Sequence, residues 1–117
     1  MNLSELNHTW FIDIDGTILD HNGYKTGEEK LLPGVKEFWS KIPEGDCVVL
    51  VTGRPSEYDE STIKFLKDND ITFDHIMFNM PLGERIVIND TKPSGLQTAI
   101  AINLERNKGL GDILWVQ

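Results

Sequence analysis

Two aspartates, Asp13 and Asp15, stand two residues apart in the segment Phe-Ile-Asp-Ile-Asp-Gly-Thr. Side chains alternate between faces along a strand, so residues at this spacing share a face. Two carboxylates held this close repel each other, and a hard cation relieves the repulsion. Oxygen-only sites with few carboxylates suit Mg²⁺, which keeps several of its waters. An aspartate can also attack phosphorus as a nucleophile, and a second acid nearby can then move the proton.

Two later segments carry polar groups that would serve the same chemistry. Thr52 and Arg54 follow one apolar run, and Asp90 and Lys92 follow another. A threonine hydroxyl can donate to a phosphoryl oxygen, and Asp90 would add a third carboxylate for the cation. Neutralising charge on the transferred group is the main demand of phosphoryl transfer, and Arg54, Arg85 or Lys92 could meet it. The three histidines are isolated, so no zinc-binding pattern competes.

Alternating strands and helices are the elements that must position these groups. Strands are predicted at 9–14, 47–51, 76–78, 85–88 and 99–104, and helices at 33–42, 56–69 and, as a single turn, 94–98. The last strand could instead be helical, and residues 16–33 are predicted to be a loop. This order indicates an α/β fold with a mainly parallel sheet. Ligands bind beyond the carboxyl ends of such strands, so the polar groups are expected to meet at one rim.

Composition narrows the class of protein. The chain has 117 residues, which predicts one domain spanning residues 1–117. Its formal net charge of −8 argues against a nucleic-acid partner, because such proteins usually carry a basic surface. The polar residues Met1 to His8 do not resemble a secretory signal, and no apolar run approaches the ~20 residues of a membrane span. We therefore expect a cytoplasmic protein without a membrane partner.

Three segments in order resemble motifs of the haloacid dehalogenase (HAD) superfamily. Phe-Ile-Asp-Ile-Asp-Gly-Thr at 11–17 is similar to the first motif, Val-Leu-Val-Thr-Gly-Arg at 49–54 to the second, and Ile-Val-Ile-Asn-Asp at 86–90 to the acidic fourth. The resemblance covers essentially the whole chain. It implies a Rossmann-like three-layer sandwich and a magnesium-dependent phosphomonoester hydrolase that forms an aspartyl-phosphate.

The resemblance also implies a role for each site residue. Asp13 would be the nucleophile, and Asp15 the general acid and base, with its backbone carbonyl on Mg²⁺. Thr52 would bind the phosphoryl group. Asp90 would be the third metal ligand, although Asn89 replaces the acid that often precedes it in the family.

The third motif of the family, a lysine after the preceding strand, is missing here. Met80 stands where a lysine is expected and cannot supply a positive charge. Lys92, two residues beyond Asp90, is the favoured catalytic replacement, and Arg85 is the other candidate. Gly53, Arg54 and Arg85 are expected to contact the substrate. Arg54 could instead pair with an acid.

The spacings between the motifs are too short for an inserted cap domain. The chain therefore looks like a capless member of the family, whose open site a partner subunit could close, so a homo-oligomer is expected. The run Ile-Asn-Asp-Thr-Lys-Pro resembles sugar-phosphate phosphatases of surface-polysaccharide synthesis, which implies a small phosphorylated substrate. Two alternatives stay open: a receiver-like module that accepts a stable phosphoryl group, and a catalytically idle regulatory partner, which Met80 would favour.

Overall fold

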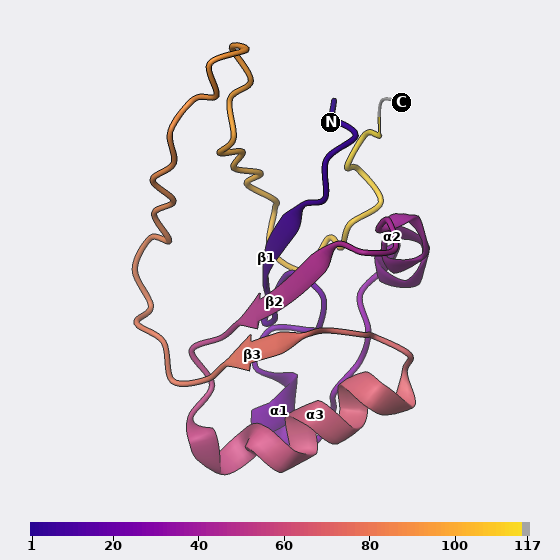
Figure 1. Ribbon diagram of the computed structural model, residues 1–117. Helices are drawn as coiled ribbons and strands as arrows, with labels where there is room; N and C mark the ends of the chain where they lie inside the picture. Colours follow the sequence, from indigo (N-terminus) through magenta and orange to yellow (C-terminus); the bar gives the residue numbers. More distant parts are fainter. Residues whose placement is uncertain (116–117) are drawn as a thin grey trace.

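The computed structural model describes residues 1–115, which contain a three-stranded parallel sheet with helices packed against it (Figure 1). In chain order the elements are β1 (Thr9–Asp13), α1 (Gly23–Thr26), α2 (Val35–Lys41), β2 (Cys47–Val51), the 3₁₀ turn η1 (Ser56–Tyr58), α3 (Asp59–Asp68) and β3 (His75–Met77). The predicted α/β class and the parallel sheet are confirmed. Across the described residues, no helix has both the length and the apolar character that crossing a membrane requires.

The central strand β2 runs parallel to β1 on one side and to β3 on the other. The register pairs Asp13 with Val51, and Val51 with Met77. The three strands therefore end at the same level, and the chain leaves each of them at the same edge of the sheet. This edge is the predicted rim, and it brings the residues after Asp13 close to Thr52.

One face of the sheet packs against α2 and α3. Ile12, Leu50 and Ile76 are paired across the three strands and all contribute to the hydrophobic core. The helices add buried apolar side chains to the same core: Val35, Phe38 and Trp39 from α2, and Leu66 from α3. The helices are thus held to the sheet by one continuous apolar cluster.

The opposite face of the sheet carries the alternate residues of the same strands. Phe11 pairs with Val49, and Val51 pairs with Met77. Within residues 1–115 these four side chains lie outside the core cluster, and Phe11 is 60% exposed. A large aromatic ring on the edge strand β1 is therefore open to solvent.

Local sequence sets the helix boundaries. Gly34 precedes α2 with a φ of 76°, a left-handed conformation that glycine adopts without strain. The helix stops before Pro43, because a proline disfavours helical backbone in the residue ahead of it. The helix predicted from residue 56 starts later: Ser56 begins η1 without a side-chain cap, and α3 starts only at Asp59.

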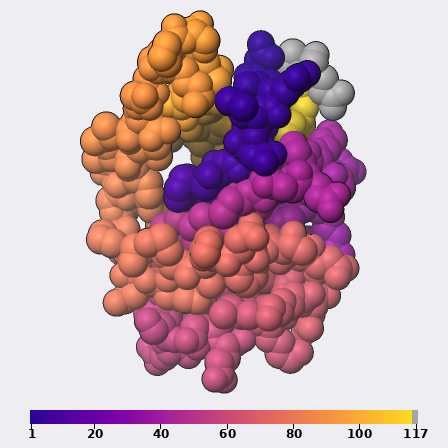
Figure 2. All heavy atoms as spheres, in the orientation of Figure 1, coloured from indigo at the N-terminus to yellow at the C-terminus, as the bar shows by residue number. Residues whose placement is uncertain are grey.

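Residues 82–102, called the arm below, form a long excursion that leaves from the carboxyl end of β3 (Figure 1). The strands predicted at 85–88 and 99–104 and the helical turn predicted at 94–98 are wrong. Within residues 1–115 these segments join no strand ladder, and in Figure 2 the arm stands off from the sheet. Its apolar side chains are therefore exposed, by 45% to 89%: Leu82, Ile86, Val87, Ile88, Ile100 and Ile102.

The tip of the arm is an ordered turn. Thr91 and Gln97 form an antiparallel bridge across it. The Gly95 N–H donates to the Lys92 carbonyl at 2.8 Å, and the Lys92 N–H donates to the Leu96 carbonyl at 2.9 Å. Gly95 has a φ of 94°, the left-handed residue that closes a three-residue hairpin loop. The arm is thus built like a hairpin whose legs lack a sheet to join among the described residues.

The chain returns from the arm to the main body of the protein. The Asn107 N–H donates to the Gly16 carbonyl at 2.8 Å, beside the aspartate pair. Leu110 is buried in the core cluster, and Trp115 packs on Phe38 with 5.2 Å between ring centroids. The segment after the arm therefore completes the core that the sheet and helices began.

Candidate active site at the ends of β1 and β2

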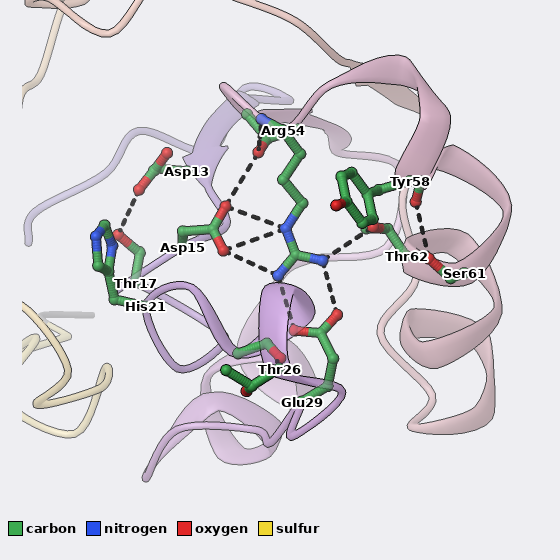
Figure 3. Close-up of polar contacts among 12 residues, drawn as sticks. Asp13, Asp15, Thr17, His21, Thr26, Glu29, Arg54, Tyr58, Ser61 and Thr62 are labelled. Atoms are coloured by element: carbon green, nitrogen blue, oxygen red, sulfur yellow. Dashed lines mark hydrogen bonds and ion pairs between the residues drawn. The ribbon is translucent and has the colours of Figure 1, made fainter.

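Asp13 is the last residue of β1, and its carboxylate lies at the predicted rim (Figure 3). The Thr17 hydroxyl donates to Asp13 Oδ2 at 3.1 Å. Gly16 makes the turn between them possible, since its φ of 82° lies in the left-handed region. The Asp13 side chain is 35% exposed, so its carboxylate is open to an incoming group.

Arg85 is the cation that lies nearest to this carboxylate in the predicted set. Its Nη1 donates to Asp13 Oδ1 at 3.2 Å, and its side chain is 43% exposed. Lys92, which the sequence favoured for this role, lies in the turn at the tip of the arm and is exposed. The geometry therefore favours Arg85 over Lys92 as the positive charge beside Asp13.

Asp15 is held by Arg54 in a bidentate ion pair (Figure 3). Arg54 Nε donates to both carboxylate oxygens at 3.1 Å, and Nη2 donates to Oδ1 at 2.9 Å. The other side of the guanidinium is bound by Glu29, with Nη1 donating to Oε2 at 2.7 Å and Nη2 to Oε1 at 2.8 Å. Arg54 is only 1% exposed, and its two carboxylate partners satisfy it. Of the roles considered for Arg54, pairing with an acid is the one observed.

The surroundings of Arg54 keep it charged. Burial by itself would lower the pKa of Arg54, but hydrogen bonds to Glu29 and Asp15 outweigh it and raise the pKa above its ordinary value. Thr62 accepts a further bond from Nη1 at 2.9 Å. The Tyr24 ring lies 4.4 Å from the guanidinium carbon, a cation–π contact. Burial, followed by the charge of Asp15, raises the pKa of the Tyr24 phenol, so it stays neutral.

Thr52 directly follows β2 and is fully buried. Its hydroxyl donates to Asp15 Oδ2 at 3.2 Å and accepts the Arg54 N–H at 3.0 Å. The hydroxyl proton is therefore used within the protein in this arrangement. A Cβ added at Gly53 would come within 2.4 Å of a Leu82 methyl group, so Gly53 makes room for the start of the arm.

Asp90 does not join the aspartate pair. It lies in the arm and is exposed, and its backbone carbonyl accepts the Thr98 hydroxyl. Residues 1–115 contain no group of three or more His, Cys, Asp or Glu side chains placed to hold a metal ion. Asp15 has both oxygens engaged by Arg54. Asp90 therefore lies apart from Asp13 and Asp15 in this arrangement.

Sequence reasoning missed Glu29 and Tyr24. Both come from the 16–33 segment, which was predicted to be a loop and in which the short helix α1 forms. Glu29 follows another acid, Glu28, and nothing in that local pattern distinguishes them. A buried charge is normally paired, and only that general rule could have directed attention to acids in this segment.

Taken together, the rim holds two carboxylates that differ in exposure. Asp15 is fixed with Arg54 and Thr52, whereas Asp13 is 35% exposed and lies beside a half-exposed arginine, Arg85. An exposed carboxylate next to a guanidinium can receive an electrophile that carries negative charge, such as a phosphoryl group. Comparison of this chain with protein-family models, curated proteins and solved structures gave no match.

Proposed function

We propose that the chain is a phosphomonoester hydrolase in which Asp13 is the nucleophile. The observation that carries the proposal is the partly exposed Asp13 carboxylate at the end of a parallel strand, with Arg85 Nη1 at 3.2 Å. Parallel sheets bind ligands at this edge. The proposal includes the larger Rossmann-like sandwich that the resemblance implies and a sugar phosphate or similar small metabolite as substrate.

The proposed reaction has two steps. An Asp13 oxygen attacks phosphorus, the bond from phosphorus to the leaving oxygen breaks, and that oxygen takes up a proton to leave as an alcohol. Water then attacks phosphorus, the bond to Asp13 breaks, and inorganic phosphate leaves. Asp15 is the proposed proton donor and acceptor. Arg54 must release at least one Asp15 oxygen for this role, because both oxygens accept its hydrogen bonds.

In this proposal, Arg85 neutralises the negative charge of the transferring phosphoryl group. The transferring group spreads negative charge over its outer oxygens, and a fixed cation beside them lowers the barrier. Arg85 is half-exposed and touches Asp13 alone among the acids of the site, so it can turn toward a bound phosphoryl group. Arg54 is a positioning residue, because its donors are already used by Asp15 and Glu29.

Magnesium dependence is part of the same proposal. When bound, the ion would reduce the repulsion between the substrate and this acidic chain, whose formal net charge is −8. The donors would be Asp13, the backbone carbonyl of Asp15 and Asp90. Asp90 has to approach the pair for that set to form.

A phosphatase assay with Mg²⁺ tests the proposal, using sugar phosphates, nucleotides and small phosphorylated acids. We expect steady phosphate release from at least one class. Asp13→Asn should lower kcat/KM by about three orders of magnitude or more, as loss of a nucleophile does. Asp112→Asn, an exposed aspartate elsewhere, is the matched control and should keep wild-type activity. A folded protein that turns over no substrate of the panel would reject the proposal.

The second candidate function is a phosphate-binding regulatory module. The engagement of both Asp15 oxygens by Arg54 favours it, because Asp15 is then held as a hydrogen-bond acceptor. Incubation with a small phosphoryl donor distinguishes the two. A stable phosphoryl group on Asp13, found by mass spectrometry without phosphate release, would support the module.

A further inference from the structure

Arg106 lies against the turn that carries the aspartate pair. A Cβ added at Gly16, the residue after Asp15, would come within 3.0 Å of Arg106 Cγ and within 3.7 Å of its Cδ and Nε. The stem of Arg106 therefore runs over Gly16, and its guanidinium begins beside this turn. The same turn carries Thr17, whose hydroxyl donates to Asp13 Oδ2. Arg106 thus brings a positive charge to the rim from a segment far along the chain.

A β-turn over residues 105–108 fixes Arg106 in this place. The N–H of the last residue of the turn donates to the carbonyl of the first at 3.3 Å, with Arg106 and Asn107 at the centre. Asn107 has a φ of 64°, a left-handed conformation that asparagine tolerates. Its N–H donates to the Gly16 carbonyl at 2.8 Å, and its Oδ1 accepts the His21 N–H at 2.9 Å. The position of Arg106 is therefore set by the main chain and the side chain of its neighbour.

The charge of Arg106 is not used by an acid of residues 1–115. None of the ion pairs within that part of the chain involves Arg106, and the residue is exposed. Arg54 and Arg85, by contrast, are each bonded to carboxylates of the rim. A guanidinium carries several N–H donors, and those of Arg106 are open to a ligand that reaches the rim.

The charge balance of the rim indicates which ligand Arg106 would bind. Arg54 and Arg85 offset two of the three carboxylates with which they pair, so these groups together keep one negative charge. The whole chain has a formal net charge of −8. An anionic substrate that enters this field needs a positive charge that the protein has not already paired. The planar fork of a guanidinium matches two oxygens of a phosphate group, so phosphate is the ligand chemistry that fits Arg106.

We propose that Arg106 is an anion-binding residue of the site, which holds outer oxygens of the substrate's phosphoryl group beside the turn at Gly16. Arg85 approaches Asp13 Oδ1 from the beginning of the arm, whereas Arg106 comes from the segment that follows the arm. The two ends of the arm thus each bring one guanidinium group to the rim. The binding of phosphate by Arg106 is independent of turnover, whereas its part in the reaction rests on the proposed function.

Isothermal titration with inorganic phosphate in the presence of Mg²⁺ tests the binding without any activity. Arg106→Met removes the charge and keeps a long stem over Gly16, and it should weaken phosphate binding about 10- to 100-fold, as loss of a charged hydrogen bond does. Arg106→Lys keeps the charge and should recover part of that loss. The matched control, Lys108→Met, removes an exposed positive charge from the same turn and should change phosphate binding less than about twofold, because an exposed charge without direct contact is screened by salt.

Three results of the titration would overturn the proposal. The first is phosphate binding that Arg106→Met leaves unchanged. The second is an equal loss for Arg106→Met and Lys108→Met, which would assign the effect to net charge. The third is a wild type that binds no phosphate. Urea unfolding shows whether each variant is folded, and Arg106→Gln serves the same comparison if Arg106→Met does not fold.

Steady-state kinetics tests the part of Arg106 in the reaction. Arg106→Met should raise KM about tenfold or more and change kcat less than about threefold, the result expected when substrate and transition state lose the same binding energy. A purely structural role would lower kcat through the folded fraction and leave KM and phosphate affinity unchanged, which overturns the proposal while the hydrolase stands. A wild type that binds phosphate through Arg106 but turns over no substrate rejects the proposed function and leaves the anion-binding residue in place.

Discussion

Two β-branched runs of this chain look alike in sequence and end up in different structures. Cys47–Val51 forms the central strand β2, whereas the run Ile86-Val87-Ile88 stays in the extended, exposed arm. β2 is bonded on both sides by β1 and β3, and no such neighbour flanks the arm within residues 1–115. The comparison shows that an apolar pattern makes a segment suitable for a strand. The strand forms only where a neighbouring strand can bond to it.

The two arginines of the rim differ in the same way. Arg54 is buried between Asp15 and Glu29, whereas Arg85 is 43% exposed with a single contact to Asp13. The buried arginine fixes the geometry of its partners, and the exposed one is free to change its own. Stability should therefore depend on the first and reactivity on the second.

The largest expected effect on stability is that of Arg54→Ala. The substitution leaves the Asp15 and Glu29 carboxylates facing each other without a cation, and breaking a buried ion pair of this kind costs about 3–5 kcal/mol. Arg85→Ala removes a half-exposed pair and should cost less than about 1 kcal/mol. Urea unfolding of both variants measures the difference. Equal losses of unfolding free energy would show that burial does not make Arg54 more important for stability than Arg85.

A second pair of substitutions tests the two apolar runs. Leu50→Ala deletes a fully buried side chain of β2 and should lower the free energy of unfolding by about 2–5 kcal/mol. Ile88→Ala, on the exposed arm, should change the free energy of unfolding of the monomeric protein by less than about 0.5 kcal/mol. Thermal or urea unfolding at low protein concentration provides the comparison. A large loss for Ile88→Ala under those conditions would mean that the arm packs within one copy.

A smaller effect, which depends on pH, is expected at Asp46, at the amino end of β2. Burial would raise the pKa of Asp46, but the His8 backbone N–H, the Trp10 indole and the His8 ring donate to it and leave the pKa below its ordinary value of 3.8. A carboxyl group with a lowered folded pKa stabilises the protein above 3.8 and loses that contribution as the pH falls through the folded value.

Asp46→Asn should therefore destabilise the protein by about 1.5–3 kcal/mol near neutral pH, the range for hydrogen bonds to a charged group. The free energies of unfolding of the wild type and the variant should converge as the pH falls below 3.8, where the wild-type carboxyl also becomes neutral. Urea unfolding at several pH values checks this. A difference that stays constant with pH would assign the loss to packing alone.

Much of the fold followed from the sequence because its signals are local. Apolar runs bounded by turn residues predicted β1, β2 and β3, and the stripe of Val35, Phe38 and Trp39 predicted α2. The rim followed as well, because parallel strands end together. The arm was mispredicted, because strand formation there depends on a neighbour that no local pattern encodes.

The site was predictable in part for the same reason. Asp13, Asp15, Thr52 and Arg54 follow strands whose ends the sheet brings together. The ion pair between Arg54 and Glu29 joins residues that no periodicity relates, and it depends on how the loop before α2 folds back. The choice of Arg85 over Lys92 likewise depends on the course of the arm, which the sequence did not predict.

The return of the chain after the arm has a consequence for rates. Leu110 lies in the core, and Asn107 and Met80 fix the two ends of the arm to the same rim. The backbone bonds of Asn107 to Gly16 and of Leu110 to Pro33 join the last part of the chain to its beginning, so the core is completed only after a long loop has closed. Contacts between residues so far apart in sequence slow folding, so this chain should fold more slowly than a domain of the same size built from local contacts.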